Sequence, residues 1–170
     1  MALTGKFKCQ ATLTHTGASD LSTLTDVVDG TSLPSWTIAS GTGANQADMI
    51  WHDQRTLAAS TSEELDLAGS LTDTFGTTLT FARIKGLIVY AASDNGALIQ
   101  VGGAAANGFV NWVASATDIL QVRAGGTFSL MAPDATAYAV TAGTGDLLKI
   151  NNTDGGAGAT YDIYIIGASA

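Results

Sequence analysis

Cysteine, proline, histidine and charge are all scarce in this sequence of 170 residues. It has one cysteine, two prolines and two histidines, and only 13% of its residues are charged. Cys9 has no partner for a disulfide within the chain. It is either a reactive thiol or a small buried side chain, and we expect burial because free cysteines pack as small hydrophobes. A chain of this length buries about 70% of its unfolded surface, so it needs no disulfide or metal to fold.

Positive charge and long apolar runs are also rare. Seven Lys and Arg against fifteen Asp and Glu give a formal net charge of −8, which argues against nucleic acid as a partner because phosphates bind basic surfaces. The longest run without a polar side chain covers residues 86–92, far less than the roughly 20 residues of a membrane span. No secretory leader is visible. We therefore expect synthesis in a reducing cytoplasm and no membrane partner.

Residues suited to catalysis or metal binding are few. His15 and His52 lie far apart in the sequence, and Cys9 has no second ligand at metal-binding spacing. The only two glutamates, Glu63 and Glu64, are adjacent, so in a strand they point to opposite faces and cannot form an acid–base pair. The sequence predicts neither an enzyme nor a bound metal or cofactor.

Glycine-rich turns and short apolar segments dominate the rest. Eight apolar segments at spacings of about 8–12 residues, separated by turn signals, are typical of a β-sandwich or barrel. Two facing sheets bury one face of each, so we predict an all-β, jelly-roll-like sandwich over residues 21–170. Residues 81–85 also fit a single helical turn before their strand. The apolar segments are residues 84–90, 97–101, 109–113, 119–122, 127–131, 138–141, 147–150 and 161–166.

The N-terminal segment, residues 1–20, is predicted to be a strand or extended arm. Apolar and polar residues alternate over residues 5–14, as in a strand with one wet face, and a turn cluster follows at residues 15–20. This is also the most basic part of the chain, so Lys6, Phe7 and Lys8 are candidate contacts to a partner. An edge strand protected by lysines explains the same residues equally well.

A hairpin is predicted where residues 48–57 meet residues 63–67 across a turn of small residues. Centring that turn near Ser60 places Arg55 opposite Asp66, to within one residue. An exposed ion pair of this kind contributes at most about 1 kcal/mol. The predicted hairpin supplies the candidate interface residues, which are Trp51, His52, Asp53, Arg55 and Asp66.

Several of these segments resemble small structural proteins encoded among the head genes of tailed bacteriophages. The residues that carry the resemblance are 43–59, 64–71, 75–76, 81–85 and 161–167. Proteins of this type are similar to capsid decoration (cement) proteins. The resemblance implies a jelly-roll homotrimer on the outer surface of the virion, over junctions between subunits of the major capsid protein. Its partners would then be that capsid protein and further copies of itself.

The main alternative is a receptor- or glycan-binding jelly-roll module of a phage tail or fibre. In that case Trp36, Trp51 or Trp112 would provide a stacking platform for a sugar. A head–tail joining protein built on a β-barrel is a further possibility. Copy number separates these hypotheses, because a capsid decoration protein is present in hundreds of copies per particle and a tail protein in a few tens or fewer.

Overall fold

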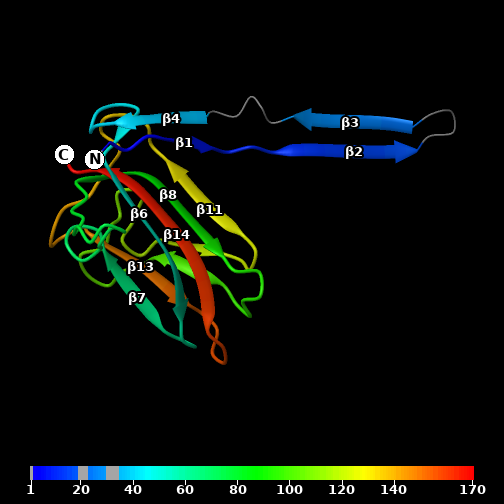
Figure 1. The fold of residues 1–170 in the computed structure, drawn as a ribbon. Coiled ribbons are helices and arrows are strands. Elements are labelled where there is room, and N and C mark those ends of the chain that lie inside the picture. Colours follow the sequence, from blue (N-terminus) through cyan, green and yellow to red (C-terminus); the bar gives the residue numbers. More distant parts are fainter. Residues whose placement is uncertain (1, 19–22, 30–34) are drawn as a thin grey trace.

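The computed structural model describes residues 2–18, 23–29 and 35–170. The described residues form strands and turns without any helix. The predicted β-sandwich is confirmed. The helical turn considered at residues 81–85 is wrong, because this segment enters strand β8 (Arg83–Ala91). Figure 1 shows the sandwich as a body with a long two-stranded ribbon extending from it.

Two antiparallel sheets make up the body. One antiparallel sheet has five strands. In it, the short strand β12 (Tyr138–Ala139) pairs with β8, as β11 does. Its other strands run in the order β11 (Thr127–Met131), β8, β14 (Ala159–Ala168) and β6 (Met49–Leu57). The four-stranded sheet has the order β10 (Ile119–Val122), β9 (Ile99–Gly102), β13 (Leu147–Asn152) and β7 (Ser62–Asp66).

The strand order shows how the chain passes between the sheets. With β12 left out and the eight sandwich strands numbered 1 to 8 along the chain, the five-stranded sheet reads 1-8-3-6 and the four-stranded sheet 2-7-4-5. Strands β6 and β7 therefore belong to different sheets, and the hairpin predicted between them is wrong. The small residues between them carry the chain across the sandwich, so that Leu57 and Leu65 are buried in the same core.

Alternation along the strands builds that core. In β14, Tyr161, Ile163 and Ile165 are completely buried, while the residues between them face outward. Full burial of such side chains stabilises the fold by about 1.5–3 kcal/mol each. Seven of the eight predicted apolar segments contain a strand. The exception is residues 109–113, where Phe109 is buried but Val113 donates a hydrogen bond to Val110 within a turn.

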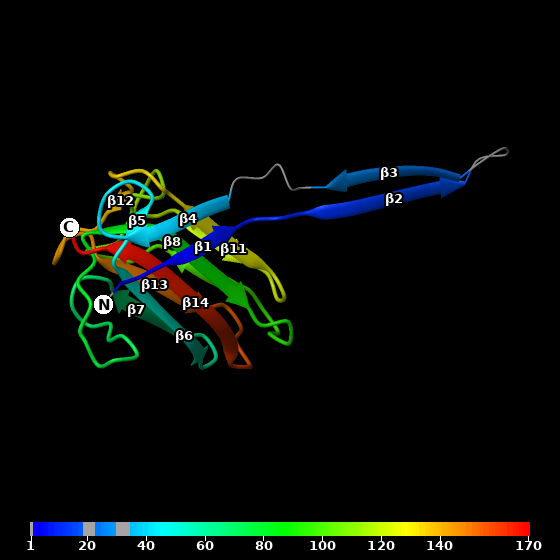
Figure 2. The ribbon, with the colours of Figure 1, turned by 45° about the horizontal axis from the view of Figure 1, so that its top comes forward.

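A third, smaller sheet covers part of the outer face of the five-stranded sheet (Figure 2). It contains β1 (Gly5–Lys8), β4 (Ser35–Ser40) and β5 (Gln46–Ala47), with Phe7 directly opposite Trp36. Both side chains are buried, and their cluster packs against Ile88 and Ile166 of the sheet below. A Cβ at Gly86 would lie 3.3 Å from the Phe7 ring, so the missing side chain there lets the ring approach the sheet.

The ribbon consists of β2 (Thr12–Ala18) and β3 (Thr23–Asp29), paired antiparallel along their whole length. It extends the line of β1 and β4 away from the body (Figures 1 and 2). Residues 23–29 thus belong to the arm and not to the sandwich. Residues 15–18 continue a strand where a turn was predicted, and residues 19–20 lie outside the described part. Cys9, expected to be buried, is exposed at the base of the ribbon.

Trp36 should be the main attachment of the small sheet to the body. It is only 4% exposed, and its indole N–H has no hydrogen-bond partner within the described residues. Truncating a buried tryptophan costs about 3–5 kcal/mol, whereas a buried unsatisfied donor costs about 1–3 kcal/mol. We predict that Trp36→Ala lowers the free energy of unfolding by at least about 3 kcal/mol, measured by urea denaturation.

The conservative variant tests the reason for this loss. Trp36→Phe keeps most of the packing and removes the unpaired donor, so it should lose less than half as much stability as Trp36→Ala. Equal losses in the two variants would contradict this account.

Candidate docking surfaces

The N-terminal contact candidates separate into two groups. Lys6 and Lys8 are exposed on β1. Phe7, between them, is 6% exposed and belongs to the cluster that holds the small sheet on the body. Phe7 is thus an anchor of β1 and is not available on the surface. The two lysines are left as the candidate contacts at the base of the ribbon.

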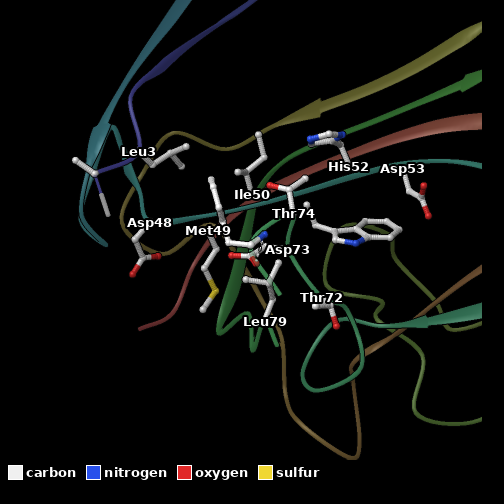
Figure 3. A pocket seen from close by; sticks show the side chains of 13 residues that line it. Leu3, Asp48, Met49, Ile50, His52, Asp53, Thr72, Asp73, Thr74 and Leu79 are labelled. Atoms are coloured by element: carbon white, nitrogen blue, oxygen red, sulfur yellow. Dashed lines mark hydrogen bonds between the residues drawn. The ribbon is translucent and has the colours of Figure 1, made fainter. Parts of the chain in front are cut away.

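A pocket of about 400 Å³ lies beside β6, the outermost strand of the five-stranded sheet. Figure 3 shows Leu3 and Ile50 on one side of it, Leu79 on the other, and Met49 and Asp73 between them. Its volume falls in the range of small-molecule sites, and its lining combines seven apolar residues with six polar ones, three of which are aspartates. The loop that closes it carries Phe75, which is 72% exposed.

Three of the predicted interface residues line this pocket. Trp51 is buried in the core and touches the pocket from inside the sandwich. His52 points to the outer face of the sheet, where its ring stacks on Tyr164 with centroids 6.1 Å apart. Asp53 lies further along β6 and pairs with Arg55 at 3.0 Å. Ile50, His52 and Tyr164 therefore form an exposed rim of apolar and aromatic side chains.

Arg55 and Asp66 do not meet. The Arg55 guanidinium donates to Glu63 Oε2 from Nε at 2.7 Å and lies within 2.6 Å of it through Nη2. The hydroxyl of Tyr161 donates to Glu63 Oε1 at 2.8 Å. Asp66 instead accepts a hydrogen bond from the backbone N–H of Ala68 at 2.8 Å. The predicted partner is wrong because β6 and β7 cross between sheets and do not form a hairpin.

This network closes the gap between the two sheets at one edge of the sandwich. The hydrogen bond to Glu63 raises the pKa of Arg55 above its usual value. Burial, followed by the hydrogen bond to Glu63, raises the pKa of Tyr161. Inward-pointing charges at a sheet edge discourage pairing with other chains. The network thus protects the half of β6 that contains Asp53 and Arg55.

Lys85 was not singled out in the sequence, yet its side chain is completely buried. Its ammonium donates to the backbone carbonyl of Thr42 at 3.1 Å and to that of Gly43. Burial lowers the pKa of Lys85 below its usual value, and the charge of Arg83 adds to this effect. The lysine fixes the loop between β4 and β5 onto the outer face of the five-stranded sheet.

A second groove lies at the opposite edge of the sandwich, between β10 and β11. Trp112 and Phe128 meet there with ring centroids 5.4 Å apart, and Ile119 beside them is 48% exposed. Trp36 and Trp51 are both buried. Of the three tryptophans considered as a stacking platform, Trp112 is the one with an accessible edge.

Comparison of the chain with family models, curated proteins and solved structures finds no match. Within the described ranges, no cluster of three or more His, Cys, Asp or Glu side chains is placed to hold a metal ion. The same residues contain no helix with the length and apolar character of a membrane span. The docking surfaces are therefore interpreted from their own geometry.

Glu63 should stabilise the sandwich edge more than its exposed neighbour Glu64 does. Hydrogen bonds to charged groups contribute about 1.5–3 kcal/mol, and Glu63 accepts them from Arg55 and Tyr161. We predict that Glu63→Gln lowers the free energy of unfolding by about 1–2 kcal/mol, whereas Glu64→Gln changes it by less than about 0.5 kcal/mol. Urea denaturation of both variants measures the difference, and equal effects would contradict the assigned role.

Lys85 should make stability depend on pH in the alkaline range. Its pKa is lowered in the folded protein, whereas an unfolded lysine titrates near about 10.4. Between the two pKa values the unfolded chain binds a proton that the folded chain does not. Stability therefore rises with pH through this window.

The control for this prediction is Lys85→Met, which lacks the titrating group. The free energy of unfolding of the wild type, relative to that of Lys85→Met, should increase as pH rises through the folded-state pKa towards about 10.4. A difference that is flat or falls over this range would contradict the lowered pKa.

Proposed function

We propose that this protein decorates and stabilises the outer surface of a tailed-phage capsid by docking at junctions between major capsid protein subunits. The observation that carries the proposal is the ribbon, which reaches well beyond the body and pairs only with itself among the described strands. An isolated two-stranded ribbon is marginally stable in water. A ribbon that extends from the body without support is therefore expected to be stabilised by contact with another molecule.

The order of the strands supports the jelly-roll fold that is part of this proposal. Orders of 1-8-3-6 and 2-7-4-5 in two facing sheets fit a jelly roll, in which two Greek keys fold together. We therefore propose that the confirmed sandwich is of the jelly-roll type. The resemblance of residues 43–59 and 161–167 to phage head proteins supports the same assignment.

The capsid contact is proposed at the base of the ribbon. Lys6 and Lys8 are exposed there, in a chain whose net charge is −8. Two isolated basic side chains give weak binding for one copy. Many copies on a lattice, linked as homotrimers, bind far more tightly because each attached site raises the effective concentration of the next. Attachment of this kind needs neither a catalytic group nor a cofactor.

The first test is location and copy number. Electron microscopy of purified particles of the phage that carries the gene should show this protein on the outer lattice of the head, in hundreds of copies. A few copies on the tail or fibre would favour the receptor-binding alternative, and density at the neck would favour a joining protein. Either result would contradict capsid decoration.

Charge reversal tests the contact itself. Deleting residues 1–8 would also remove Phe7 from its cluster, so we prefer the surface variant Lys6→Glu/Lys8→Glu. It should lower occupancy on capsids stripped of this protein by at least about tenfold, since losing two exposed charge contacts costs about 1.4 kcal/mol or more. Arg123→Glu, an exposed charge reversal next to β10, should have no effect. Unchanged occupancy in the double variant would rule out this contact.

Glycan binding is the second candidate, favoured only by the accessible edge of Trp112 in the groove beside Phe128. Stacking on a sugar would require this indole. A glycan array without hits would exclude this candidate, as would hits that persist in Trp112→Ala.

A further inference from the structure

The chain exposes more surface than a compact protein of its size. Its accessible area is 8958 Å², whereas a monomeric globular protein of this mass exposes about 7,800 Å². The excess, on the order of 1,200 Å², exceeds the roughly 800 Å² that each partner contributes to an interface of standard size. The excess is thus large enough for an interface of ordinary size.

The ribbon is one part of this unburied surface. Every residue of β2 is exposed, and Leu13 and Val27 are 63% and 60% exposed. Thr14 lies opposite Val27 in the register. Val27 therefore occupies the face opposite to that of Leu13, and each face of the ribbon presents an apolar side chain. Both long edges of the ribbon also carry backbone groups that no described strand pairs with.

The edge of β6 is the other part. This strand has nine residues, more than any other outermost strand of the two sheets, and β14 is its only neighbour among the described strands. The half of β6 that contains Asp53 and Arg55, here called the far half, is protected by the charges of these two residues. The half that contains Met49 and Ile50 is called the near half. Its near half borders the pocket, with Ile50 40% exposed and Phe75 72% exposed. Unpaired backbone beside a pocket that can take a side chain is the arrangement that binds an added strand.

The two parts cannot meet within one chain. The ribbon leaves the body in line with β1 and β4 and points away from β6 (Figures 1 and 2). A ribbon from a second copy supplies what the near half of β6 lacks, namely a free strand edge and apolar side chains for the pocket. An arm that docks on a different surface of its neighbour makes a heterologous contact, which closes into a ring when the rotation allows it.

We propose that the ribbon of one copy pairs with the near half of β6 of a second copy, placing Leu13 or Val27 in the pocket beside Ile50 and Phe75. This self-association takes place in solution and does not depend on a capsid. It gives the expected homotrimer a specific interface, in which each subunit extends one arm and receives another. It draws on the same ribbon as the proposed function but concerns a contact between copies in solution, so light scattering of the free protein tests it separately from occupancy on capsids.

Light scattering of the wild type and of a variant without the ribbon tests this contact between copies. The wild type should be a small closed oligomer at micromolar concentration. Lys8 is paired with Ser35, so an Asn-Gly turn in place of residues 9–34 removes the ribbon while preserving the β1–β4 hairpin. That variant should be a folded monomer, with its sandwich intact by circular dichroism. A wild type that stays monomeric at high concentration, or a ribbonless variant that stays oligomeric, would overturn the proposal.

Two exposed isoleucines provide a matched pair for the receiving site. Ile50 lies on β6 beside the pocket, and Ile119 lies on β10 at the opposite edge of the sandwich. Ile50→Lys should shift the oligomer towards monomer by at least about tenfold in dissociation constant, since a buried lysine charge replaces an apolar contact. Ile119→Lys should leave it unchanged. The reverse result would assign the interface to the groove of Trp112.

Cross-linking shows directly which surfaces meet. In a Cys9→Ser background, Thr14→Cys places a thiol on the ribbon and His52→Cys places one on β6 beside the pocket. A mixture of the two single-thiol proteins, treated with a short bis-maleimide, should give a heterodimer. Thr14→Cys mixed with Thr117→Cys, an exposed position in the loop before β10, is the control. Equal yields in both mixtures would contradict docking at β6.

Discussion

The contact of Phe7 and Trp36 with the outer face of the five-stranded sheet is the interaction on which the shape of this protein depends. These two side chains lie opposite each other on β1 and β4 and are buried against Ile88 and Ile166. They fix the direction in which both strands leave the body. The ribbon continues that direction, so its orientation is set by the packing of Phe7 and Trp36 at its base and not by contacts along its length. Lys85 supports the same arrangement by holding the loop that follows β4.

The five-stranded sheet is consequently used on both faces. Its inner face, with Tyr161, Ile163 and Ile165, forms the main core, and part of its outer face carries the small sheet. The uncovered part of the outer face presents His52 and Tyr164 next to the free edge of β6. The polar network around Glu63 seals one half of that edge. The network around Glu63 therefore covers one half of the β6 edge and leaves the half near Ile50 uncovered.

Much of the fold could be predicted from local patterns, because the sandwich strands are short, alternate regularly and are bounded by glycine turns. The order of the strands could not, since the link between β6 and β7 reads like a hairpin turn and only distant partners decide which sheet each strand joins. Alternation placed Phe7 and Cys9 on one face of the same strand, but only Phe7 is buried, because β1 leaves the body after Lys8. Phe7 was predicted as a partner contact, and the burial expected for Cys9 from its small apolar side chain was wrong. Every ribbon side chain that the structure describes is exposed, and the apolar residues of the sequence over residues 23–29 do not alternate regularly.

The candidate site was predicted less well because it also depends on contacts between residues that are far apart in the sequence. Trp51, His52, Asp53 and Arg55 were found from their strand, but Glu63 and Lys85 owe their roles to partners far away in the sequence. A charged residue at an inward position of an edge strand is the signal that identifies Glu63. For Lys85, the nearest signal is a lysine within an otherwise apolar strand. Neither residue is informative until the sheets have been assembled.

The exposed thiol at the root of the arm has a practical consequence. Because Cys9 is the only cysteine and lies where the chain passes from body to ribbon, a maleimide dye or gold cluster would tag each molecule once, at its pivot. Distances between such tags would report how far apart the bases of the arms lie in an assembly, without any engineered mutation.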